Sequence, residues 1–147
     1  MRLLDDVETI VLVTGSSESA RDRERPLAEW LGAEIARRGD GQWGRRAVIT
    51  GDEEYYASDV LQRHPTIAIG GPGVNAVTQQ FFPRLPMLYT ADERVWIQGD
   101  FEAEQKRAGL WGADAAGTSD AVNAFVIHGF LDRMLERLWR FRGGALV

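Results

Sequence analysis

The pattern of apolar and polar positions divides the first half of the chain into short strand-like runs and longer helical stretches. Residues 9–14, 46–50 and 66–69 are rich in apolar and β-branched residues, as are strands covered on both faces. From Pro26 to Gly39, apolar side chains recur at helical spacing, which predicts a helix between these two residues. Three acids at residues 52–54 favour the start of another helix, which would end before His64 and Pro65. Residues 16–25 are polar and predict a loop.

In the second half of the chain, the predicted strands follow one another more closely. Glycines and a proline at residues 70–73 predict a turn, after which Val74, Val77 and Phe81 recur at helical spacing. Residues 87–90 and 95–98 are short strand candidates separated by four polar residues, which favours a hairpin. A further strand at residues 108–112 leads into one long helix that is expected to end at Gly143 and Gly144.

This order predicts a single α/β domain over residues 1–147. Strands that alternate with helices form parallel sheets, whereas closely spaced strands pair antiparallel. The expected architecture is a three-layer α/β/α sandwich, Rossmann-like, whose mixed sheet combines a parallel core with an antiparallel hairpin. We find no internal repeat and no interior linker.

Composition narrows the function classes. Twenty-two acidic and 17 basic residues give a net charge of −5, which is unfavourable for nucleic-acid binding. The absence of cysteine excludes disulfides, thiolate nucleophiles and cysteine-ligated metals. No apolar run suits a signal peptide or a membrane span. We therefore expect a soluble cytoplasmic protein that binds neither nucleic acid nor membranes.

The candidate ligand site follows from the glycine-rich turn after residues 66–69. Glycines let a ligand approach the backbone, and the start of the next helix offers unpaired N–H groups. The carboxyl ends of parallel strands meet at one edge of a sheet, so loops from three strands would converge there. We expect a small anionic ligand, bound by residues drawn from these loops: Ser16, Ser17, Gly70, Gly71, Gly73, Asn75, Asp114 and Thr118.

Structural explanations compete with each of these assignments. The glycines would equally suit a tight turn, and Asn75 and either Thr118 or Ser119 suit helix caps. Neither His64 nor His128 has partners at metal-site or triad spacing, and no Walker, zinc-protease or G-x-G-x-x-G motif occurs. No metal site is predicted, no cofactor is assigned, and the sequence leaves open whether the protein is an enzyme.

Two segments of the second half resemble a known family. Residues 67–75, IAIGGPGVN, and residues 110–122, LWGADAAGTSDAV, are similar to two strand–turn–helix segments of certain prokaryotic surface-layer-type domains, in the same order. The resemblance implies a shared α/β module in the second half of the chain, with no catalytic activity to carry over.

A second resemblance concerns the end of the first strand. Residues 13–17, VTGSS, are placed like the phosphate loop of flavodoxin-like proteins and small FMN reductases, which implies a flavin or nucleotide near Ser16 and Ser17. That loop runs directly into its helix, whereas here about ten polar residues are expected to intervene before Pro26. Two hypotheses result: a non-catalytic protein with an anionic-ligand site, or a flavin- or nucleotide-binding enzyme or carrier of flavodoxin-like type.

The last predicted helix also suggests self-association. Phe130, Trp139 and Phe141 lie partly off its apolar stripe, beside several arginines. Aromatic residues and arginine are enriched at protein interfaces, so a homodimer through this helix is expected. The alternative is that the helix buries a broad face in its own core.

Overall fold

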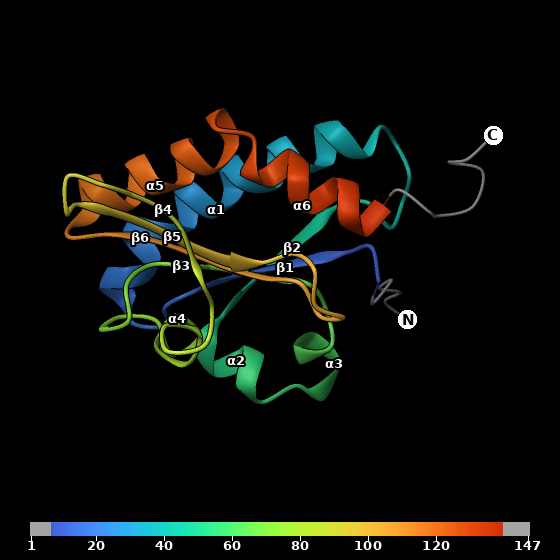
Figure 1. Ribbon diagram of the computed structural model, residues 1–147. Coiled ribbons are helices and arrows are strands. Elements are labelled where there is room, and N and C mark those ends of the chain that lie inside the picture. Colours follow the sequence, from blue (N-terminus) through green and yellow to red (C-terminus); the bar gives the residue numbers. More distant parts are fainter. Residues whose placement is uncertain (1–6, 140–147) are drawn as a thin grey trace.

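Six strands form one mixed sheet with helices on both faces in the computed structural model, which describes residues 7–139 (Figure 1). In sheet order the strands are β2 (Ala47–Gly51), β1 (Ile10–Thr14), β3 (Thr66–Ile69), β6 (Arg107–Gly112), β5 (Val95–Asp100) and β4 (Met87–Ala91). The first four are parallel, and β5 runs antiparallel to both β6 and β4. The predicted α/β fold, with a parallel core and an antiparallel hairpin, is confirmed.

The helices are divided between the two faces of the sheet. In chain order they are α1 (Glu18–Gly39), α2 (Asp52–Tyr56), α3 (Asp59–Gln62), α4 (Ala76–Phe81), α5 (Ala115–Ile127) and α6 (Phe130–Trp139). Figure 1 shows α1, α5 and α6 on one face and α2, α3 and α4 on the other. None of them, within residues 7–139, is long and apolar enough to cross a membrane.

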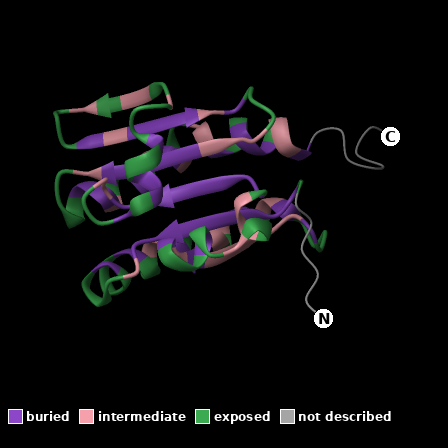
Figure 2. Ribbon diagram, turned by 90° about the horizontal axis from the view of Figure 1, so that it is seen from below, coloured by how far each residue is buried: buried purple, intermediate pink, exposed green. Residues whose placement is uncertain are grey.

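The core has two parts because successive residues of a strand point to opposite faces. In β1, Ile10 and Leu12 pack under α1, whereas Val11 and Val13 pack against α2 and α4. All four are fully buried, and burial of each contributes roughly 1.5–3 kcal/mol. The central strands are accordingly the most buried elements, and the edge strand β4 is partly exposed (Figure 2).

The first helix begins earlier than its pattern predicts. Residues 18–25 belong to α1 rather than to a loop, and Ser17 caps the helix by accepting a hydrogen bond from the N–H of Ala20. Pro26 lies inside the helix, not at its start. Residues 18–25 are mostly polar, yet this part of α1 has a buried face. A polar residue, Glu24, occupies a buried position on it between Ala20 and Ala28.

Two predicted helices are each split in the structure. The stretch from residue 52 to residue 62 contains two helices, α2 and α3, and Ser58 caps the second by accepting from the N–H of Leu61. The long last helix is interrupted at Gly129, whose φ of +83° lies in the left-handed region that favours glycine. This break separates α5 from α6. The expected end at residues 143–144 lies outside the described residues.

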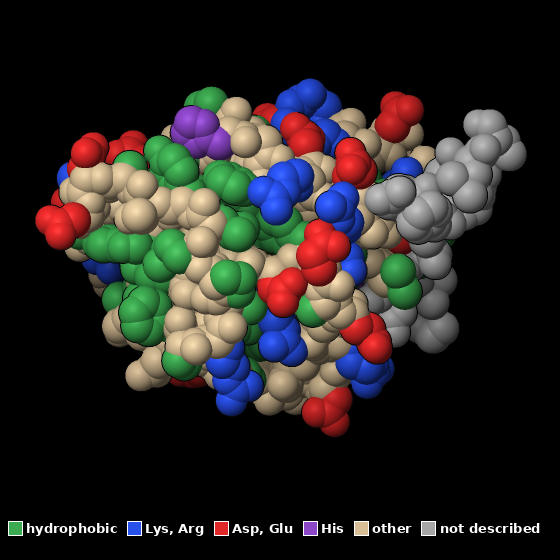
Figure 3. All heavy atoms as spheres, in the orientation of Figure 1, with side chains coloured by type: hydrophobic (Ala, Val, Ile, Leu, Met, Phe, Trp, Pro, Cys, Tyr) green, Lys and Arg blue, Asp and Glu red, His purple; other side chains and the backbone are tan. Residues whose placement is uncertain are grey.

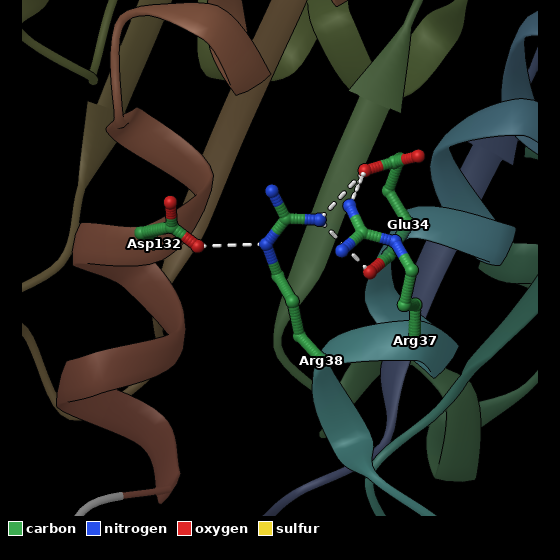
Figure 4. A network of polar contacts seen from close by, with 4 residues as sticks. All are labelled: Glu34, Arg37, Arg38 and Asp132. Carbon is green, nitrogen blue, oxygen red and sulfur yellow. Dashed lines mark hydrogen bonds and ion pairs between the residues drawn. The ribbon is translucent and has the colours of Figure 1, made fainter.

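Helix α6 is tied back to α1 at the surface. Arg38 of α1 donates from Nε to Asp132 of α6 at 2.7 Å and from Nη1 to Glu34 of its own helix at 2.8 Å (Figure 4). Asp132 is well exposed, so the pair contributes at most about 1 kcal/mol. The contact therefore affects the orientation of α6 relative to α1 more than it affects the stability of the fold.

Trp139 was expected at the surface, partly off the apolar stripe of its helix, and this expectation is wrong. Its side chain is only 6% exposed, its Nε1 donates to the carbonyl of Glu8 at 3.0 Å, and the Arg45 guanidinium lies 5.3 Å from its ring. Phe130 is partly buried and packs near Phe125, and Phe141 lies outside the described residues. Association through this helix stays a prediction, and Trp139 belongs to the core.

Candidate functional site

A cavity of about 520 Å³ opens at the carboxyl ends of β3 and β6. Its walls come from α1, from the turn before α4, from β5 and β6, and from the start of α5. Four of the sequence-predicted residues line it: Gly71, Gly73, Asp114 and Thr118. The structure thus brings together loops from two of the three expected strand ends.

Glu24 is the most informative residue of the cavity wall. The residue is 4% exposed, and Oε1 of its carboxyl accepts a hydrogen bond from the N–H of Gly15 at 2.9 Å. Oε2 has no hydrogen-bond partner among the described residues. Burial raises the pKa of Glu24 from 4.5 to about 7, against the opposing effects of the Gly15 N–H and Arg23. The carboxyl therefore changes charge near neutral pH.

The turn after β3 is shaped around this carboxyl. A Cβ built at Gly70 would lie 2.4 Å from Oε2 of Glu24, and the φ of Gly70 is +113°. Both facts require glycine at this position. Gly73 differs, because no atom lies within 4 Å of a Cβ built there. Gly73 therefore borders open space inside the cavity.

Two tryptophans supply the aromatic part of the wall. Trp96 and Trp111 are directly opposite each other on β5 and β6, with ring centroids 6.0 Å apart and planes inclined by 19°. The rings of Phe82 and Trp111 meet in a T-shaped arrangement, with centroids 5.9 Å apart. Hydrophobic side chains gather near the turn of the β4–β5 hairpin in Figure 3. Such a surface suits a planar ring, since offset stacking is favourable for aromatic groups.

The start of α5 forms the polar side of the cavity. Asp114 is the N-cap, accepting from the N–H of Gly117 at 2.7 Å, so neither Thr118 nor Ser119 has that role. Thr118 instead accepts from the N–H of Gly112 and donates to the carbonyl of Asp114. The first helical N–H groups, of Ala115 and Ala116, have no intrahelical acceptor and would attract a negatively charged group.

The remaining predicted residues do not line the cavity. The Ser16 hydroxyl donates to Asp52 at 2.6 Å and accepts from the N–H of Glu53, and Ser17 caps α1. Asn75, expected as a cap, is one: its Oδ1 accepts from the N–H groups of Val77 and Thr78.

The other end of the Asn75 amide joins two strands. Nδ2 donates to the carbonyls of Val13 and Ile69 at 2.9 Å each, and the residue is 1% exposed. Asn75 therefore holds the ends of β1 and β3 together from below the turn and keeps no polar atom free for a ligand. Like Gly70, it shapes the site without lining the cavity.

Sequence reasoning missed Glu24, Arg23 and both tryptophans. A signal for Glu24 was present, because Ala20, Glu24, Ala28, Leu31 and Ile35 recur every three or four residues, as one face of a helix does. The tryptophans could be assigned only once Trp96 and Trp111 were known to be paired, and this pairing depends on the register between β5 and β6.

No protein-family model matches the chain, and no curated protein is detectably similar to it. Both resemblances described above therefore stay hypotheses. Within residues 7–139, no three His, Cys, Asp or Glu side chains are grouped so that they could hold a metal ion.

Proposed function

We propose that this protein binds a small anionic ligand with a planar ring in the cavity beside Glu24. One observation carries the proposal: a buried carboxyl, with one oxygen held by the N–H of Gly15 and the other unpartnered, lines a cavity at the carboxyl edge of the parallel strands. Ligands of open α/β sheets bind at this edge, outside the strand ends. Buried titratable groups in clefts are also enriched at functional sites.

The chemistry of the wall defines the class of ligand. A flat ring would stack near Trp96 and Trp111, and a negatively charged group would lie at the N–H groups that open α5. Arg23 is the lining cation. A protonated Glu24 would donate a hydrogen bond to the ligand from Oε2, whereas an ionised Glu24 would repel an anion. Ligand binding should therefore take up a proton near neutral pH.

Flavins and nucleotides combine a flat ring with a phosphate, so the flavodoxin-like hypothesis falls within this class. It is favoured by the way β1 passes into α1 after only Gly15, Ser16 and Ser17. The flavodoxin-like hypothesis would put the phosphate near Ser16. The Ser16 hydroxyl, however, is bonded to the Asp52 carboxylate, which would repel a phosphate. In our proposal the phosphate lies at the start of α5 instead.

Binding rather than catalysis is proposed. Among the lining residues, the one hydroxyl group belongs to Thr118, and its hydrogen bonds are to the backbone of Gly112 and Asp114. Its hydroxyl proton is therefore donated to a backbone carbonyl and not to a side-chain base that would activate it as a nucleophile.

The proposal is tested with FMN and AMP as probes. Absorbance and native mass spectrometry of freshly purified protein would show any ligand retained from the cell, and quenching of tryptophan fluorescence would report binding of each probe. Gly73→Val adds a side chain to open space, so we expect a folded protein that binds at least about tenfold more weakly. Unchanged affinity in this variant would place the ligand elsewhere.

A second variant tests the role of Glu24. Glu24→Gln keeps an oxygen to accept from Gly15 and an N–H donor at the unpartnered position. Wild-type affinity should fall roughly tenfold for each pH unit above about 7, whereas the variant should bind with little pH dependence. Glu29→Gln, at an exposed position of the same helix, is the matched control. Equal pH dependence in Glu24→Gln and wild type would contradict the proposal.

A further inference from the structure

A second, smaller cavity lies on the face of the sheet that α2, α3 and α4 cover. Its volume is about 190 Å³, and its walls come from α2, α3, α4, the residues just after α4 and the start of β6. It has no lining residue in common with the cavity beside Glu24. We propose that this cavity binds a phosphate group, held by Arg84 and Arg107.

The two arginines have no counter-ion in the described part of the chain. Within residues 7–139 neither forms an ion pair, and none of the residues that line the cavity is acidic. Two guanidinium groups at one cavity repel each other unless an anion lies between them. A phosphate dianion would balance both charges.

Arg107 carries the strongest evidence for a missing partner. Its Nε is buried and makes no hydrogen bond among the described residues, although a buried N–H without an acceptor is unfavourable. One end of the guanidinium donates from Nη2 to Gln105, and the group lies 5.6 Å from the Phe81 ring centroid. These contacts hold one end of the guanidinium. Nε itself is closed to solvent in this structure, so a turn of the side chain toward the cavity is needed for a ligand oxygen to supply the acceptor that Nε lacks.

The neutral side chains of the cavity add donors. The Tyr56 hydroxyl donates to Oε1 of Gln80 at 2.5 Å, which leaves the Gln80 amide nitrogen without an acceptor among the described residues. Burial raises the pKa of Tyr56, so its hydroxyl keeps its proton at neutral pH. The cavity thus offers several N–H donors and two positive charges, the set that proteins use to bind phosphate.

Packing is the competing explanation, since Arg107 over Phe81 is a cation–π contact and Arg84 is exposed. Packing alone, however, leaves Nε of Arg107 without an acceptor. The two explanations differ in what added phosphate does to the protein.

The test uses inorganic phosphate, followed by calorimetry and by the ¹⁵N–¹H NMR signal of Arg107 Nε, with sodium chloride at matched ionic strength as the baseline. We expect saturable binding below roughly 10 mM, a downfield shift of that signal, and similar binding of sulfate. Acetate, a monoanion, should bind about tenfold more weakly. Glycerol phosphate distinguishes a phosphomonoester from free phosphate as the ligand.

Arg84→Gln removes one charge at an exposed position, so the variant should fold. It should weaken phosphate binding about tenfold. Arg21→Gln, an equal change of charge on the exposed side of α1, should change it less than about twofold. Equal binding by the two variants, or an unmoved Arg107 signal at saturating phosphate, would show that only general salt effects act and would overturn the proposal.

Discussion

Glu24 is held in a place where its charged form is unfavourable. Its carboxyl receives a single hydrogen bond from the N–H of Gly15, and Gly70 leaves it room only because it has no side chain. Desolvation outweighs that hydrogen bond, which is why the pKa rises to about 7. A structural acid in the same position would gain stability from a full set of donors. The incomplete set is better explained by a ligand.

The raised pKa of Glu24 makes stability depend on pH. Between about 4.5 and 7 the folded state binds more protons at this residue than the unfolded state does. The free energy of unfolding should therefore fall as pH rises through this window, by roughly 3 kcal/mol, and level off above it. Urea unfolding across the window measures the effect. Glu24→Gln should lose this contribution, and Glu29→Gln should keep it; a Glu24→Gln curve parallel to wild type would contradict the expectation.

For single residues, the sequence predicted roles that depend on neighbours along the chain, and it did not predict roles that depend on residues far away in the sequence. The cap at Asn75 follows from its place before an apolar helical pattern. Of the three glycines in the turn, only Gly70 has positive φ, and its requirement comes from a carboxyl 46 positions earlier in the chain. The spacing of glycines cannot distinguish these cases, because the deciding contact is tertiary.

Among the elements, the start of α5 offers a clear test because sequence and structure assign different caps. The structure gives the role to Asp114, whose carboxylate accepts from the N–H of Gly117. Asp114→Ala should lower the free energy of unfolding by about 1 kcal/mol. Ser119→Ala should change it by less than about 0.5 kcal/mol, since Ser119 lies inside the helix. Chemical denaturation of both variants measures the difference, and the reverse order would restore Ser119 as the cap.

Strands were predicted more accurately than helices, for a physical reason. A buried parallel strand is a short run of apolar residues, so β1 and β3 were recognisable from composition alone. A helix shows only one face to the core, and a polar residue on that face breaks the pattern, as Glu24 does in α1. Pro26 was also misleading, because a proline that suits the start of a helix here lies in its interior.

In the whole molecule, the mixed sheet explains why the main cavity lies where it does. The chain leaves β1 in one direction to form β2 and later returns beside β1 as β3, so loops from two strands diverge at that edge. The sequence predicted a parallel core and a hairpin, but not the position of β6 between β3 and β5. That position places the Trp111 ring beside the glycine-rich turn. The aromatic wall therefore depends on strand order, which local patterns do not encode.

The C-terminal end of α6 is joined to the residues just before β1 through the side chains of Trp139 and Arg45. Trp139 donates to the carbonyl of Glu8, and Arg45 connects the two by donating to the Trp139 carbonyl at 2.7 Å and pairing with Glu8 at 3.0 Å. Arg45 and Glu8 are both largely buried, so this pair is screened less than the surface pair at Arg38. The described chain is thus held together across 131 positions of sequence.

The contacts of Trp139 with Glu8 and Arg45 predict that Trp139 stabilises the fold. This role can be tested separately from any role in self-association. Trp139→Ala should lower the free energy of unfolding by about 3–5 kcal/mol, because it opens a cavity in the core and removes the hydrogen bond to Glu8. Trp43→Ala makes the same change at a residue that is 60% exposed and should cost less than about 1 kcal/mol. Urea unfolding compares the two variants, and light scattering reports their molar mass. A Trp139→Ala protein of wild-type stability but half the wild-type mass would instead place this residue in a dimer interface.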